Sequence, residues 1–73
     1  MLVPYSMFSV NLVVITKGRA EDAYVLLSEL ADICDGPCPL IRNVIETRDQ
    51  NVLVLFDSDV ELLIKKLNDA YVE

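Results

Sequence analysis

The segment Val52–Phe56 has no polar member, and it constrains the fold of this chain more than any other feature. A strand that is apolar on both faces is normally covered on both faces. The segment therefore fits a central strand, and it equally fits a strand at an interface between two protein chains. The chain has only 73 residues, which make one domain with a small core, so little material is left to cover two sheet faces.

Two other segments are predicted to be strands. Residues 8–15 are rich in β-branched side chains and alternate in polarity before they become continuously apolar, and residues 40–47 form a second candidate. The polar residues 48–51 are expected to join this second strand to Val52–Phe56 as a hairpin loop. Residues 1–7 are expected to be an N-terminal arm that leads into the first strand.

The spacing of apolar residues predicts two helices. The first follows a turn at Gly18, covers residues 20–34 and ends where Gly36 can take the left-handed conformation. The second opens with Ser58 and Glu61, which have the S-x-x-E form of a capping box, and it runs to the C-terminus. The apolar stripes are Ala20, Ala23, Tyr24, Leu27, Leu30, Ala31 and Cys34 in the first helix, and Val60, Leu63, Ile64, Leu67, Ala70 and Tyr71 in the second.

The element order β-α-β-β-α predicts an α+β fold, with a three-stranded antiparallel sheet and both helices on one face. Residues 8–73 are expected to form this single domain, since no linker, repeat or low-complexity stretch divides them. Such a fold leaves the second face of the sheet bare. We expect that face to be covered by an additional strand, a second copy of the chain or a different subunit.

A protein interface is therefore predicted on the bare sheet face and on the apolar margins of the helices. A continuously apolar strand does not reveal which of its side chains face the helices, so the alternate register, with Leu53 and Leu55 on the bare face, stays open. The interface predicted from the first register comprises Val13, Ile15, Val52, Val54 and Phe56 from the strands and Leu26, Ile33 and Leu62 from the helices.

Residue types that carry catalysis are scarce. The chain has no histidine, and its two glycines are too few for a phosphate-binding loop. The acidic pairs Glu21 with Asp22 and Asp57 with Asp59 stand at the starts of the predicted helices, where the helix dipole favours negative charge. We therefore expect a protein that is not an enzyme and that has neither a cofactor nor a metal site.

Cys34 and Cys38 form a C-x-x-x-C pair. The plain interpretation is two free thiols, one at the end of the first helix and one in the following loop. A disulfide across this short turn stays open. A zinc site shared between two chains also stays open, although such a site takes four ligands.

The formal net charge is −6, from twelve acidic and six basic residues. Nucleic-acid binding relies on clustered positive charge, so direct contact with nucleic acid is not expected. No apolar run approaches the roughly 20 residues of a membrane-spanning helix, and the N-terminus lacks the pattern of a secretory signal. We expect a cytoplasmic protein whose partners are other proteins.

Residues 16–24, with an A-E-x-A-Y core, the helix opening at residues 57–60 and the β-α-β-β-α order resemble the small dimerising subunit of the archaeal and eukaryotic KEOPS complex. The resemblance covers the chain from Phe8 onward. It implies a non-catalytic subunit of the machinery that places threonylcarbamoyl on adenosine in tRNA. It also implies pairing through the sheet, as a homodimer or heterodimer, and packing of both helices against the catalytic subunit.

The acidity of the chain departs from that family, because members that assist tRNA binding are expected to carry more positive charge. The departure favours a divergent paralogue that pairs with the main dimerising subunit and modulates its self-association. Two alternatives stay open. One is a small-molecule-sensing regulatory domain with ferredoxin-like topology, and the other is an acidic inhibitor of an enzyme that acts on nucleic acid.

Overall fold

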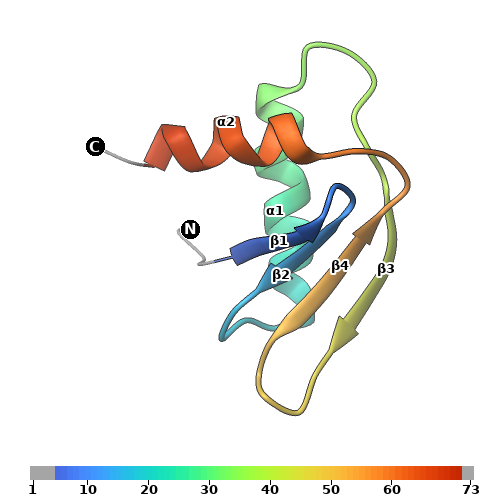
Figure 1. Cartoon of the computed structure of the whole chain (residues 1–73), viewed down its shortest axis with the longest axis vertical. Helices are drawn as coiled ribbons and strands as arrows, with labels where there is room; N and C mark the ends of the chain where they lie inside the picture. Colours follow the sequence, from blue (N-terminus) through green and yellow to red (C-terminus); the bar gives the residue numbers. More distant parts are fainter. Residues whose placement is uncertain (1–4, 72–73) are drawn as a thin grey trace.

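The computed structural model describes residues 5–71, which form one antiparallel sheet with two helices packed on one of its faces (Figure 1). The sheet has the strand order β1-β2-β4-β3, and every neighbouring pair is antiparallel. The elements are β1 (Tyr5–Ser9), β2 (Leu12–Ile15), α1 (Ala20–Ile33), β3 (Ile41–Glu46), β4 (Val52–Phe56) and α2 (Glu61–Tyr71).

The predicted α+β class and the β-α-β-β-α order are confirmed by the elements from β2 onward. The sheet has one strand more than predicted, because the expected strand at residues 8–15 is divided by a turn at Val10 and Asn11. Asn11 in this turn is hydrogen-bonded to the end of β4. Its carbonyl accepts the Phe56 N–H at 2.9 Å, and its side-chain amide donates to the Phe56 carbonyl at 3.3 Å. The predicted arm at residues 1–7 is therefore corrected, since residues 5–7 pair with β2 and residues 1–4 lie outside the described part of the chain.

The predicted hairpin between the last two strands is confirmed. Thr47 and Asn51 close the loop, with the Thr47 N–H donating to the Asn51 carbonyl at 2.9 Å and the Asn51 N–H donating to Thr47 Oγ1 at 3.2 Å. Gln50 takes the left-handed conformation, with φ of 63°. The hairpin sets the register of β3 on β4, and β4 lies between β2 and β3 as the predicted central strand.

The hydrophobic core lies between the helices and one face of the sheet. Alternate residues of β4 point into it, as do two residues of β2, because successive side chains of a strand point to opposite faces. The buried core residues are Val13, Ile15, Val52, Val54 and Phe56 from the sheet, Ala23, Leu26 and Leu30 from α1, and Val60, Ile64 and Leu67 from α2 and the residue before it.

The apolar stripe of α1 is rotated from the predicted one. Leu26 is buried and Ile33 packs against the core, whereas Tyr24 and Ala31 of the predicted stripe are exposed. The helix ends at Ile33, and Cys34 leaves it in an extended conformation, with φ −74° and ψ 129°. The predicted left-handed cap at Gly36 is wrong, because the backbone has already turned out of the helix two residues earlier and Gly36 has no positive φ.

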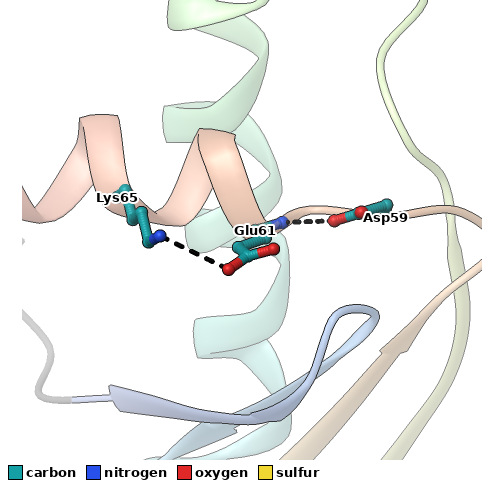
Figure 2. Close-up of polar contacts among 3 residues, drawn as sticks. All are labelled: Asp59, Glu61 and Lys65. Atoms are coloured by element: carbon teal, nitrogen blue, oxygen red, sulfur yellow. Dashed lines mark hydrogen bonds and ion pairs between the residues drawn. The ribbon is translucent and has the colours of Figure 1, made fainter.

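The start of α2 also differs from the predicted capping box. Asp59 Oδ1 accepts the Glu61 N–H at 2.7 Å (Figure 2). The Ser58 hydroxyl instead donates to Asp57 Oδ1 at 3.2 Å. An aspartate two residues before an N–H donor satisfies a helix start as well as a serine does, so the neighbouring acid took the role predicted for Ser58. The carboxylate of Glu61 instead pairs with Lys65 at 3.3 Å, a solvated i,i+4 contact that stabilises the helix by about 0.3 kcal/mol.

We predict that Gly18→Ala destabilises the fold by about 1–3 kcal/mol. A Cβ at this position would lie 2.6 Å from Cγ2 of the buried Ile15, so the core must shift to admit it. Gly36→Ala is the matched control, because nothing lies within 4 Å of a Cβ there, and it should leave stability unchanged or raise it slightly. Urea unfolding of the two variants tests this, and equal midpoints would contradict the close approach at Gly18.

Candidate functional site

The face of the sheet that points away from the helices carries two apolar rows. Residues paired across an antiparallel ladder share a face, so the register assigns each row directly. Val14 of β2, Leu53 of β4 and Ile45 of β3 form one row, and Leu12 pairs with Leu55 in the next. We call these five residues the open sheet face. Asn43, opposite Leu55, ends the second row on β3.

No helix in the described part of the chain covers the open sheet face (Figure 1). Its five residues lie outside the core cluster between the sheet and the helices, although Val14 is itself buried. Leu12, Leu53 and Leu55 are half-buried, and Ile45 is 49% exposed. Val14 is only 4% exposed, so the accessible surface of the face comes from the other four residues. The face is therefore a continuous apolar surface rather than scattered single residues, which is the pattern of an interaction site.

On the β3 side, the open sheet face is bordered by Asn43 and by the exposed Arg42, which the bulge between Ile41 and Asn43 places next to it. On the β1 side, Ser6 pairs with Val14 and Ser9 pairs with Leu12. At the end of the sheet where Leu12 and Leu55 lie, the exposed Val10 and Leu40 add further apolar surface. A partner placed on this face would meet an apolar centre with Asn43 and Arg42 at its β3 margin, as in the centre and polar rim of known interfaces.

The register of β4 is the alternate one, so the interface predicted from the first register is corrected. Val13, Ile15, Val52, Val54 and Phe56 are fully buried against the helices and offer no surface to a partner. The reason lies in β3: Asn43 pairs with Leu55, and the opposite register would have placed this polar side chain beneath the helices.

The three predicted helix residues have different environments. Leu26 is buried in the core, and Ile33 is half-buried against it, because both lie on the side of α1 that faces the sheet. Leu62 of α2 is 73% exposed and is the only one of the three with a largely accessible side chain. The missed residues Leu12, Val14 and Ile45 were detectable only through the strand register, which the chain's own pattern does not reveal.

One residue of each acidic pair at the helix starts caps its helix. Asp22 Oδ2 accepts the Arg19 N–H at 2.8 Å at the start of α1, as Asp59 does for Glu61 at the start of α2. Among residues 5–71, no group of three histidine, cysteine or acidic side chains is arranged to hold a metal ion. No helix within the same residues is long and apolar enough to cross a membrane.

Cys34 and Cys38 are joined by a disulfide, which replaces the predicted pair of free thiols. The loop after α1 turns back on itself and brings the two Cα atoms to 5.8 Å, within the range that a disulfide spans. The bond closes a small ring over residues 35–37, beside the start of α2.

Comparisons with protein-family models, curated proteins and solved structures found no match to this chain.

Proposed function

We propose that this chain is a non-catalytic interaction subunit that pairs with a second copy of itself through the open sheet face. The observation that carries the proposal is the face itself: five apolar residues in two cross-strand rows, not covered by either helix. Two sheets that pack face to face bury such rows against each other at a spacing of about 10 Å.

The distribution of charge supports a second copy as the occupant. The chain carries a net charge of −6, so two copies repel each other unless their contact keeps the charges apart. The open sheet face contains no ionisable residue, and Asn43, the polar residue in its rows, is neutral. Two copies can therefore bury the five apolar residues while Arg42, beside Asn43 in the β3 bulge, stays at the edge of the contact. Burying an unpaired ion would cost several kcal/mol.

The larger assembly that we propose for the pair is the KEOPS complex, in which it would act as a cytoplasmic accessory or modulating subunit of tRNA threonylcarbamoyladenosine synthesis. The resemblance of residues 16–24 and the β-α-β-β-α order of the elements from β2 onward support this assignment. The net negative charge favours contact with protein subunits over contact with tRNA.

Light scattering of the purified chain, alone and mixed with the catalytic KEOPS subunit from the same source, tests both levels of the proposal. A dimer that adds the catalytic subunit supports both. A dimer without affinity for that subunit overturns the KEOPS assignment and leaves the pairing intact. A monomer at every concentration contradicts the pairing.

A further inference from the structure

A pocket with a volume of about 400 Å³ lies on the helical side of the molecule, between the end of α1 and the start of α2. It is separate from the open sheet face, because both helices pack on the other face of the sheet. One wall is the disulfide-closed loop after α1, and the other is the first two turns of α2 with the residue that caps it. The lining residues are Cys34, Asp35, Gly36, Pro37, Asp59, Leu62, Leu63 and Lys66.

Most of the surface that lines the pocket is apolar, and both of its walls are restrained. Leu62 exposes 73% of its surface, and Pro37 lies in the facing loop. Leu63 is anchored by packing against the core, and the Cys34–Cys38 disulfide restrains the loop. An exposed leucine beside a restrained loop offers a preformed contact for an aliphatic chain, which lowers the entropic cost of binding.

The charged residues of the pocket favour a cation. Asp35 and Asp59 contribute two carboxylates, and the single basic lining residue, Lys66, has its Nζ 3.7 Å from Asp35 Oδ2. The carbonyl end of α1 opens toward this loop without a basic residue in its last turn, so its partial negative charge adds to that of the carboxylates. The start of α2, which also borders the pocket, carries a partial positive charge. Asp59 already offsets that charge by accepting the Glu61 N–H.

We propose that this pocket receives an arginine side chain from a partner protein. The aliphatic stem packs on Leu62 and Pro37, and the guanidinium lies between the Asp35 and Asp59 carboxylates. Arginine fits better than lysine because its planar group has five donors and can serve two carboxylates at once. Lys66 competes with the incoming guanidinium for Asp35, so the site binds its partner by exchanging one cation for another.

The test is a titration of the ¹⁵N-labelled chain with N-acetylarginine methylamide, followed by amide chemical shifts. We expect saturable shifts confined to the lining residues, with a dissociation constant on the order of 1 mM, as a single exposed side chain would give. The neutral norleucine analogue and the acidic glutamate analogue should bind at least about fivefold more weakly, since they lack the charge pairing. Equal binding of the norleucine analogue would overturn the proposal.

Two variants with matched controls sharpen the test. Asp59→Asn should weaken arginine binding about threefold while an asparagine still caps α2, and Asp69→Asn on the exposed side of α2 should have no effect. Lys66→Gln should tighten binding, because it removes the competing cation, whereas Lys65→Gln should not. Weaker binding in Lys66→Gln would contradict the cation exchange. These readouts are independent of pairing through the sheet, which is measured as a mass.

Discussion

Val54→Lys unfolds the chain, and it does so whether or not the chain pairs with another copy. Val54 is fully buried between β2 and the helices, in register with Val13 on one side and Val44 on the other. A lysine there must either bury an unpaired ammonium or displace the core, at a cost of several kcal/mol. A domain of this size has little stability to lose, because it buries only about 60% of its unfolded surface.

Circular dichroism melting tests this prediction. Val54→Lys should show no cooperative transition, and Leu53→Lys, one residue away on the same strand, should melt cooperatively because its side chain is on the open sheet face. A folded Val54→Lys variant together with an unfolded Leu53→Lys variant would reverse the register of β4 and contradict the assigned core.

Leu53→Lys is expected to separate the paired copies without unfolding either of them. Leu53 stands at the middle of the open sheet face, between Val14 and Ile45, so a lysine there would be buried at the centre of the contact in both copies. The resulting loss of two apolar side chains and burial of two like charges should raise the dissociation constant at least about 100-fold.

Sedimentation equilibrium measures that change. Asn68→Lys is the matched control, since it adds the same charge at an exposed position of α2 and should leave the dissociation constant within about threefold of the unmodified chain. An unchanged dissociation constant in Leu53→Lys would mean that the copies meet through another surface.

The element types were predictable because each rests on a local signal. The apolar run of Val52–Phe56, the polar hairpin loop and the periodicity of Val60, Ile64 and Leu67 all indicate the elements that the structure has. The bare sheet face also followed from counting elements, because both helices within residues 5–71 pack on the other side of the sheet.

The register was not predictable in the same way. In an all-apolar strand, both sets of alternate side chains satisfy the core equally well, so the choice depends on pairing with β3 rather than on β4 itself. Asn43 opposite Leu55 decides it, and that pairing involves a bulge between Ile41 and Asn43 that shifts the alternation of β3.

Two local predictions, the cap of the second helix and the continuity of the first strand, were wrong. Asp59 took the capping position expected for Ser58, and the turn at Val10 and Asn11 interrupted a segment whose composition favours a continuous strand. The turn is supported by long-range bonds, since the Val10 carbonyl accepts the Val60 N–H at 2.7 Å across 50 residues of sequence. Tertiary contacts of this kind are invisible to a local pattern.

Pairing through the open sheet face is most directly tested by an isotope-filtered NOE spectrum of a mixture of ¹³C-labelled and unlabelled copies. We predict intermolecular contacts from the methyl groups of Leu53, Leu55 and Ile45, and none from the buried methyl groups of Val13 and Val54. A spectrum whose intermolecular contacts come only from helix residues such as Leu62, or one with no such contacts at millimolar concentration, would contradict the account.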